Sequence, residues 1–358
     1  MKNNSLKIGV IGCGYWGPNL IRNFIEIPET EVIAVADLLP KQLDYVKTRY
    51  PQIQVATQDY QDLFELGLDA MVIATPPQTH FPIARDCLNN GLHILVEKPF
   101  TLKSADAIKL NQLANSRKLI LMVGHTFEFN PAVHALKGMI HSGELGDIYY
   151  VDAVRASLGL FQTELNVVWD LAPHDISILR YILDADPINI CLQAGTCVQD
   201  GIEDIAYATL NFPNDILAHI RMSWLDPAKT RRITVVGSQK MVIYDDVENL
   251  EKIRVYDKGV KAIRRTDTFG EFQFAYHYGD VVIPYIRWEE PLRLECLHFV
   301  ESIHEGTTPR TDGISGLRVV QIIEAAQESL RHGGRLEAID DSTIPSYKKD
   351  GRPRISHA

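Results

Sequence analysis

The chain has 358 residues, of which 46% are hydrophobic and 23% charged, so it is a globular protein too long for one ordinary core, and we expect two domains. Its formal net charge of −10 disfavours general affinity for nucleic acid or anionic membranes, and no apolar run approaches the roughly 18 residues of a membrane span. The five cysteines lack any C-x-x-C spacing and the N-terminus has no signal-peptide pattern, so we expect no disulfide framework, no metal site and a cytoplasmic location.

The first predicted strand runs into a glycine-rich turn. Residues 8–11 are apolar, a helical pattern starts directly after the turn, and the glycines between them are spaced G-x-G-x-x-G. The first glycine permits the tight turn, the second lets a pyrophosphate approach the backbone, and the third lets helix and strand pack closely. The helix N-terminus adds N–H groups and a positive dipole end. The residues of this turn that we expect to contact a dinucleotide are Gly12, Gly14, Tyr15, Trp16 and Gly17.

The residue that ends the second predicted strand bears on the choice of cofactor. Asp37 follows the apolar run 32–36 and lies 20 residues past Gly17, where a ribose-binding carboxylate is expected. Such a carboxylate accepts hydrogen bonds from ribose hydroxyls and repels a 2′-phosphate. The next residue is Leu38 rather than an arginine or serine. We therefore expect NAD rather than NADP.

Strand and helix patterns alternate through the rest of the first third. We expect strands at 53–56, 69–74, 92–96 and 119–123, and helices at 40–49, 59–66, 79–90 and 103–117. This alternation predicts a doubly wound parallel sheet, in which ligands bind beyond the carboxyl ends of the strands. The residues at those ends are Gly12, Asp37, Thr75, Glu97, Lys98, Gly124 and His125. For His125, a structural role and a place near the cofactor are both open.

Lys98 stands between a buried strand and Pro99 at this edge of the sheet. Most lysines are solvated surface charges, and that interpretation stays open. At a cofactor-binding edge, an ammonium group can instead stabilise a developing alkoxide or transfer a proton. The peptide bond before Pro99 can be cis, which the sequence does not decide.

Several of these motifs resemble those of the Gfo/Idh/MocA oxidoreductases. The stretches that carry the resemblance are Thr75-Pro76-Pro77 with His80, Glu97-Lys98-Pro99, and Gly124-His125 with Pro131. The resemblance covers nearly the whole chain, and Glu-Lys-Pro is its most specific mark. It implies an NAD(P)-binding Rossmann domain followed by a domain on an open, mostly antiparallel sheet. It also implies that Lys98 is the catalytic lysine and that His80 and Glu97 lie near the cofactor. We expect Thr75 and Pro76 to bind the cofactor as well.

The pattern changes after the first domain, which we place at residues 1–125, with the second domain at 126–358. A helix over 131–142 is followed by strands at 148–157, 188–198, 204–212, 216–224, 232–237, 241–244 and 252–256, and by helices at 291–305 and 313–331. Turn signals between the strands favour antiparallel pairing. The fold class is thus an N-terminal α/β Rossmann sheet and a C-terminal α+β domain whose helices cover one face of an open sheet. An uncovered apolar face is usually a partner surface, and the resemblance implies a homodimer or homotetramer through it.

A second informative stretch lies between the strands at 148–157 and 188–198. Asp170 and His174 are four residues apart, on one side of a helical turn. One alternative is a capped helix start, with Asp170 or Asp175 near the first N–H groups and Pro173 in the first turn. The resemblance matches the pair to a D-x-x-x-H signature, and a histidine is the natural acceptor of the proton that an oxidised hydroxyl loses. We therefore expect Lys98, Asp170 and His174 to be both catalytic and in contact with substrate.

The stretch 155–177 looks most like the nucleotide-sugar branch of the family, whose members include UDP-N-acetylglucosamine and UDP-N-acetylglucosaminuronate 3-dehydrogenases. A diphosphate needs basic groups, so Arg155 is the candidate to bind it, with a strand-end surface arginine as the alternative. Asn166 and Gln162 are candidates for sugar hydroxyls. The expected function is NAD-dependent oxidation at C3 of a UDP-N-acetyl-sugar. The alternatives are an inositol or free-sugar dehydrogenase, a reductase of 3-keto dTDP-sugars, and a non-catalytic NAD-binding regulator.

Overall fold

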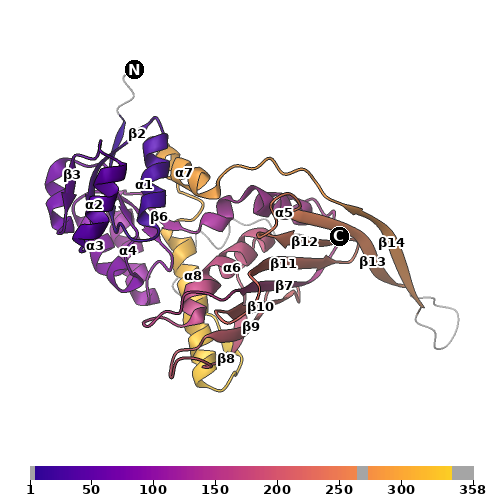
Figure 1. Ribbon diagram of the computed structural model, residues 1–358. Coiled ribbons are helices and arrows are strands. Elements are labelled where there is room, and N and C mark those ends of the chain that lie inside the picture. Colours follow the sequence, from indigo (N-terminus) through magenta and orange to yellow (C-terminus); the bar gives the residue numbers. More distant parts are fainter. Residues whose placement is uncertain (1–4, 264–272, 341–358) are drawn as a thin grey trace. The chain divides into compact units, whose positions relative to one another are not determined.

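The computed structural model describes residues 5–263 and 273–340, and the chain divides into two compact units (Figure 1). Unit 1 contains the residues up to Phe129 together with Glu289–Gln321. Unit 2 contains Asn130–Trp288 together with the residues from Ile322 onward. Unit 1 is thus built from two separate segments of the chain.

Unit 1 is organised around a six-stranded parallel sheet with the order β3-β2-β1-β4-β5-β6. Its strands are β1 (Leu6–Ile11), β2 (Thr30–Ala36), β3 (Val55–Thr57), β4 (Ala70–Ile73), β5 (His93–Glu97) and β6 (Leu121–Gly124). β4 and β6 are buried at every residue, as expected for apolar strands that are covered on both faces. The sheet winds outward in both directions from β1 and β4, which confirms the predicted Rossmann fold.

The helices of unit 1 alternate with these strands. They are α1 (Gly17–Glu26), α2 (Pro40–Arg49), α3 (His80–Asn89), α4 (Ser104–Arg117) and the short 3₁₀ helices η1 (Tyr60–Leu66), η2 (Pro77–Thr79) and η3 (Thr126–Phe129). The predicted helix at 59–66 is present, but as a 3₁₀ helix. Asp59 caps it by accepting the Gln61 N–H at 2.9 Å, and Gly67 ends it with a φ of 62°.

The late helix α7 (Pro291–Glu305) is also part of unit 1. It packs on α1 and η3, and the rings of Phe24 and Phe299 meet edge to face with centroids 6.3 Å apart. Arg22 of α1 forms an ion pair with Glu290, the residue before α7. The expectation that this helix covers the second sheet is therefore wrong. Periodicity shows that a helix has an apolar stripe, but not which surface that stripe contacts.

Unit 2 is organised around a nine-stranded sheet with the order β14-β13-β12-β11-β7-β10-β9-β8-β15. Its strands are β7 (Ile148–Ala156), β8 (Asn189–Gly195), β9 (Ile205–Asn211), β10 (Leu217–Ser223), β11 (Thr230–Gly237), β12 (Met241–Asp245), β13 (Ile253–Ile263), β14 (Gln273–Val282) and β15 (Glu337–Ala338). All pairs are antiparallel except β7 with β10, which confirms the predicted open, mostly antiparallel sheet.

The hairpin of β13 and β14 was not expected from the sequence. β13 continues past the predicted end at residue 256, and no strand was predicted where β14 lies. Every residue from Tyr276 to Val282 is exposed. A strand with both faces in solvent has no alternation of buried and exposed side chains, which is the pattern that reveals strands in a sequence.

The two faces of the second sheet differ. Ala153 and Ile220 are 0% exposed on the face that carries α5 (Pro131–His141) and α6 (Val167–Leu183), whereas the adjacent Asp152 and His219 point the other way and are partly exposed. α6 contacts β7, β9 and β10, and α5 contacts β12 (Figure 1). The remaining helix, α8 (Gly313–Arg331), has residues in both units. No helix in the described ranges is long and apolar enough to cross a membrane.

Candidate active site

The glycine turn after β1 closes against the end of β4. Gly12 has a φ of 97°, which favours glycine, and a Cβ atom there would collide with the carbonyl group of Ala74. A Cβ atom on Gly17 would collide with the carbonyl oxygen of Gly12. A Cβ atom on Gly14, in contrast, would meet nothing within 4 Å. The protein's own packing therefore requires Gly12 and Gly17, while the open space at Gly14 suits the close approach of a pyrophosphate to the backbone.

The start of α1 is suited to an anion. Trp16 occupies the N-cap position without a side-chain cap hydrogen bond, and the first turn has no acidic residue. The adjacent Tyr15 is 89% exposed. Backbone N–H groups at a helix start need acceptors, and the helix dipole favours negative charge there. The turn and the helix start together fit the diphosphate of a dinucleotide.

Asp37 holds this turn from the end of β2. One carboxylate oxygen accepts the Cys13 N–H at 2.7 Å, and the other accepts the Leu39 N–H at 2.8 Å. Because each carboxylate oxygen can accept more than one hydrogen bond, Asp37 keeps capacity for ribose hydroxyls. The next side chain, Leu38, is 79% exposed and has no donor for a 2′-phosphate.

His80 joins the loops that follow β4 and β5. Its ring is fully buried, with Nδ1 2.9 Å from the Pro99 carbonyl oxygen and Nε2 2.9 Å from the Thr75 carbonyl oxygen. Burial lowers the pKa of His80 despite these contacts, which act to raise it. Since both ring nitrogens face backbone carbonyls, His80 positions the loop at Thr75 and Pro76 and the segment after Lys98.

Glu97 and Lys98 end β5 at the same edge of the sheet. The carboxylate of Glu97 accepts the backbone N–H of Lys98 at 3.2 Å and lies against Gly124, its partner on β6. The Lys98–Pro99 peptide bond is cis. Burial raises the pKa of Glu97 to about 7, with the charge of Lys98 acting in the opposite direction. His125, just past β6, is 1% exposed.

Helix α6 begins earlier than the capped-start alternative assumed. Asn166 is the N-cap residue: its side-chain oxygen accepts the Trp169 N–H at 3.2 Å, and its amide group donates to Glu203 at 2.8 Å. The capped-start alternative is therefore right that Asp170 lies in the first turn, but the cap is Asn166, and neither Asp175 nor Pro173 lies at the helix start. The reason is that an asparagine four residues upstream of Asp170 supplies the acceptor that a helix start needs.

Asp170 and His174 lie one turn apart on α6. The carboxylate of Asp170 accepts the indole N–H of Trp224 at 3.0 Å. Pro173 lies inside the helix rather than in its first turn, so it removes the N–H that would otherwise bond the Trp169 carbonyl. The indole contact holds the Asp170 side chain in place beside the turn that carries His174.

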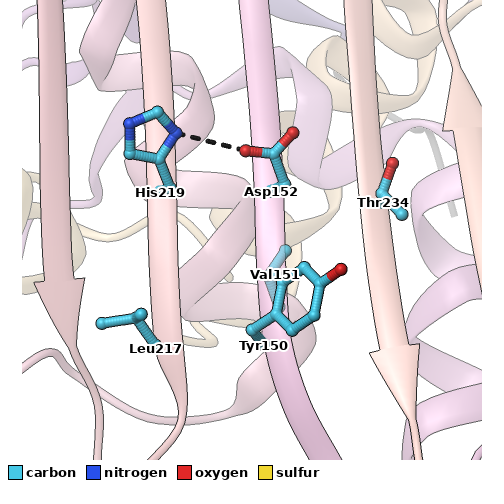
Figure 2. Close-up of a pocket in the computed structure, with 6 residues that line it drawn as sticks. All are labelled: Tyr150, Val151, Asp152, Leu217, His219 and Thr234. Carbon is cyan, nitrogen blue, oxygen red and sulfur yellow. Dashed lines mark hydrogen bonds and ion pairs between the residues drawn. The ribbon is translucent and has the colours of Figure 1, made fainter.

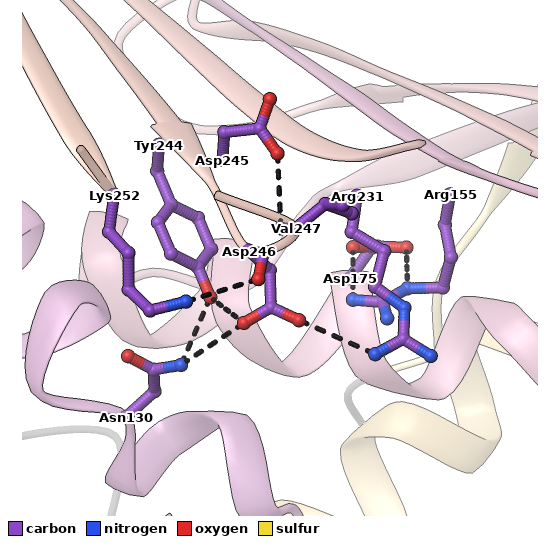
Figure 3. A network of polar contacts seen from close by, with 9 residues as sticks. All are labelled: Asn130, Arg155, Asp175, Arg231, Tyr244, Asp245, Asp246, Val247 and Lys252. Carbon is purple, nitrogen blue, oxygen red and sulfur yellow. Dashed lines mark hydrogen bonds and ion pairs between the residues drawn. The ribbon is translucent and has the colours of Figure 1, made fainter. Parts of the chain in front are cut away.

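Arg155 is buried on the helix-covered face, so the alternative of a surface arginine is wrong (Figure 3). Its Nε and Nη2 atoms donate to the two carboxylate oxygens of Asp175 at 2.7 and 2.9 Å. Desolvation lowers the pKa of Arg155, but the charge and hydrogen bonds of Asp175 outweigh it and the pKa is raised. Any anion that reaches Arg155 must therefore share the guanidinium group with Asp175.

A polar cluster that the sequence did not reveal lies close to Arg155 (Figure 3). The hydroxyl of Tyr244 donates to Asp246 at 3.0 Å and accepts from the Asn130 amide at 3.1 Å, and Arg231 pairs with Asp246 at 3.4 Å. Burial raises the pKa of Tyr244, and the Tyr244 and Asp246 side chains act electrostatically on Arg155. These residues lie on separate strands and at the start of α5, so only strand pairing brings them together.

The uncovered face of the second sheet, meaning the face on which no helix of the described residues packs, is hollowed at its centre (Figure 2). The lining residues are Tyr150, Val151, Asp152, Leu217, His219 and Thr234. The Nδ1 atom of His219 lies 3.2 Å from a carboxylate oxygen of Asp152. The ring of Tyr207 stacks on that of His219, with centroids 6.2 Å apart and planes inclined at 27°. Apolar and aromatic side chains thus surround one polar pair.

Two segments of the chain match models of known protein families. Residues 6–125 match the model described as the oxidoreductase family, NAD-binding Rossmann fold, and residues 133–243 match the GFO/IDH/MocA C-terminal domain. The two matches together span more than half of the chain. The protein therefore belongs to the Gfo/Idh/MocA family and is an NAD-binding oxidoreductase.

Individual relatives are distant but similar over most of their length. The chain is 24% identical over 342 residues to scyllo-inositol 2-dehydrogenase (NAD(+)) of Bacillus subtilis, covering 92% of this chain and 95% of that protein. It is 25% identical over 259 residues to UDP-N-acetylglucosamine 3-dehydrogenase of Acidithiobacillus ferrooxidans, covering 72% and 79%. The solved structure of that organism's UDP-N-acetylglucosamine 3-dehydrogenase GnnA superposes with a TM-score of 0.75 at 24% identity, covering 92% and 98%. This last likeness shows the shared fold.

Proposed function

We propose that the protein oxidises a secondary alcohol of a sugar, at C3 of a UDP-N-acetyl-sugar, to the ketone. Membership of an NAD-binding oxidoreductase family supports the type of reaction. The relative named UDP-N-acetylglucosamine 3-dehydrogenase supports the class of substrate. The observation that carries the catalytic assignment is the position of Lys98 just beyond β5, on the same sheet edge as the glycine turn.

NAD, when bound, supplies the acceptor for a hydride. The backbone around Gly14 and the start of α1 bind its diphosphate, and Asp37 binds the adenosine ribose. His80 acts through the two loops that it joins. The residues that we assign to the cofactor are Gly12, Gly14, Tyr15, Trp16, Gly17, Asp37, Leu38, Thr75, Pro76, His80, Glu97 and Lys98.

We assign the chemistry to three side chains. His174 takes the proton of the substrate hydroxyl, because imidazole titrates near neutral pH. The ammonium group of Lys98 stabilises the alkoxide that forms as this proton leaves. Asp170, held by the Trp224 indole, orients His174 or the substrate. The same groups serve the reverse reaction, in which a 3-keto sugar is reduced.

Two further residues are assigned to the substrate. Arg155 interacts with the diphosphate of a nucleotide sugar while keeping its ion pair with Asp175. Asn166 acts through the start of α6, because its side chain already caps the helix and donates to Glu203 and Gln327.

A second candidate function is oxidation of a free polyol such as an inositol. The observation that favours it is the similarity to the scyllo-inositol 2-dehydrogenase of B. subtilis, which extends over 92% of this chain. A free polyol has no diphosphate, so this function gives Arg155 a purely structural role.

The experiment that separates these functions follows NADH absorbance with a panel of UDP-N-acetyl-sugars, dTDP-sugars and inositols. Turnover of a UDP-N-acetyl-sugar with kcat/KM at least 100-fold above that of any inositol is the result we expect. The opposite preference would establish the polyol function. Tight NAD binding without turnover of any compound would point to a non-catalytic regulator.

We also propose that the uncovered face of the second sheet binds a second copy of this chain, giving a homodimer or homotetramer. The support is the central hollow between β10, β7 and β11, which is lined by apolar, aromatic and paired polar side chains (Figure 2). Exposed patches of this kind on sheets usually mark contact surfaces.

A further inference from the structure

Glu295 of α7 is a buried acid to which none of the assignments above gives a role. Its side chain is 0% exposed. The Oε2 atom accepts the hydroxyl hydrogen of Thr126 at 2.8 Å, and the Oε1 atom has no hydrogen-bond partner within the described part of the chain. An ionised carboxylate needs several donors to replace lost hydration. These surroundings favour the neutral, protonated acid.

The side chains of Glu295 and Glu97 each contact a residue at or just after the end of β6. Glu97 lies against Gly124, where an added Cβ atom would be 3.1 Å from its carboxyl carbon. Thr126, which donates to Glu295, follows two residues later in η3. Burial is the main cause that raises the pKa of each acid, and the charge of Glu97 raises that of Glu295 further. Two buried carboxyls that interact in this way do not both ionise near neutral pH.

The other charged groups near α7 do not favour loss of the proton from Glu295. The titratable groups that face the region are Glu97 and Lys98 at the end of β5, Glu128 of η3, Arg22 of α1, and Glu290 and Cys296 of the α7 segment. Arg22 pairs with Glu290. Glu128 raises the pKa of Glu295, and Lys98 acts on Glu97 to favour its ionised form. Because Lys98 favours ionisation of Glu97 and Glu128 opposes ionisation of Glu295, Glu97 is the acid that ionises and Glu295 is the acid that holds the proton.

We propose that Glu295 is a positioning residue that keeps its proton through the working pH range and leaves Glu97 as the one acid of the pair that ionises. The inference deepens the proposed function and rests on Lys98 being the catalytic lysine. With Glu295 neutral, the pair carries at most one negative charge. The charge that the pair adds beside Lys98 is then that of Glu97 alone.

The direct test is a carbon-13 NMR titration of glutamate carboxyls in the protein without substrate. The resonances are assigned by their loss in the Glu97→Gln and Glu295→Gln variants. We expect the Glu295 resonance to keep the position of a protonated acid while Glu97 titrates. A Glu295 resonance that already has the position of a carboxylate at pH 7 would overturn the proposal.

Two replacements of Glu295 separate its two possible charge states. If Glu295 is neutral, Glu295→Gln and Glu295→Leu each replace one uncharged group with another and leave the pKa of Glu97 nearly unchanged. If Glu295 is an anion, both variants remove a negative charge and lower the pKa of Glu97. The Gln variant is nearly isosteric with the acid, so it decides the question even where the Leu variant does not fold.

The matched control is Glu301→Gln, on the same helix but exposed, which should leave the Glu97 titration unchanged. A second readout is the pH dependence of kcat/KM, whose acidic limb should keep its position in Glu295→Gln. An acidic limb that moves to lower pH in this variant would overturn the proposal, because it would mean that a negative charge beside Glu97 had been removed. Failure of the proposed reaction itself would be seen in the substrate panel, on which the NMR titration does not depend.

Discussion

Asp37 and His80 show that contacts with the backbone limit what a side chain at the cofactor edge can do. Asp37 binds two backbone N–H groups and keeps spare acceptor capacity, so it serves the turn and a ribose together. His80 places both ring nitrogens against carbonyl oxygens, so its contribution is the position of two loops. Arg155 likewise is held by Asp175. For each residue the type was visible in the sequence, but the contacts that restrict its role were not.

Replacing Lys98 by methionine is the residue-scale test of the catalytic assignment. Methionine keeps the length of the side chain and removes the charge that stabilises the alkoxide, so kcat/KM should fall by about three orders of magnitude. NAD affinity, measured by titration calorimetry, should change less than about threefold because the diphosphate binds elsewhere. Lys109→Met, a change of an exposed lysine on α4, is the control. Near wild-type turnover by Lys98→Met would remove the lysine from the mechanism.

The raised pKa of Glu97 predicts a pH-dependent stability. The pKa is about 7 in the folded protein against an ordinary value of 4.5, so the folded state holds the proton more tightly than the unfolded chain. This stabilisation is complete below about pH 4.5 and is lost as the pH rises through 7. The free energy of unfolding should fall by about 3 kcal/mol between about pH 5 and pH 8 from this group alone.

Chemical denaturation without NAD, repeated from pH 5 to pH 8, measures the slope of the free energy of unfolding against pH. In Glu97→Gln the fall over this range should be smaller than in the wild type by about 3 kcal/mol, because the variant has no proton to lose at this position. Glu301→Gln, exposed on α7, should keep the wild-type slope. Equal slopes for the wild type and Glu97→Gln would contradict the raised pKa.

Individual elements were predicted well where their contacts are local or where they are buried. The strands that feed the cofactor edge, the glycine turn and the helices at 291–305 and 313–331 lie where the sequence indicated, because apolar periodicity and glycine conformations are set by a few neighbouring residues. The strand β14 was missed since its exposed residues carry no such periodicity. The cap of α6 is Asn166, upstream of the two acids that the capped-start alternative considered.

The glycine turn gives a test at the scale of an element. Gly17→Ala should destabilise the protein by about 2–4 kcal/mol, because its Cβ collides with the Gly12 carbonyl oxygen. Gly14→Ala should change stability by less than about 1 kcal/mol but raise the NAD dissociation constant about tenfold or more, since the added carbon fills the space that a diphosphate needs. Thermal melting and calorimetric NAD titration measure the two effects. Gly138→Ala, on α5 with open space around its Cβ, should affect neither adversely.

A Gly14→Ala variant that binds NAD as tightly as the wild type would place the diphosphate away from this turn. A Gly17→Ala variant of unchanged melting temperature would contradict the packing of α1 on the glycine turn.

At the scale of the whole molecule, chain order and spatial grouping differ. Unit 1 combines the N-terminal sheet with α7 and the first part of α8. This grouping brings Glu295 into the cofactor-binding unit, where it contacts Thr126. The second sheet carries helices on one face and a hollowed, partly apolar surface on the other, which is the basis for the proposed assembly.

The assembly is tested by placing charge in the hollow of the uncovered face. Leu217→Glu puts a carboxylate at a partly exposed apolar position there, and burying it against a second copy would cost several kcal/mol. Sedimentation analysis should show the wild type as a dimer or tetramer and the variant as a monomer at the same concentration. Leu250→Glu, at a 91% exposed loop position, should assemble like the wild type. A monomeric wild type, or an unchanged assembly in Leu217→Glu, would contradict this interface.

The sequence by itself determined the class of fold, the cofactor turn and the residues at the ends of the parallel strands. Those features depend on local conformation and on short periodic patterns, which neighbouring residues specify. Only the tertiary structure decided that α7 packs on α1, that Arg155 is buried against Asp175, and that Glu295 is buried against Thr126 just after β6. These contacts join residues that are far apart in the chain, and their energetics depend on burial, which no local pattern records.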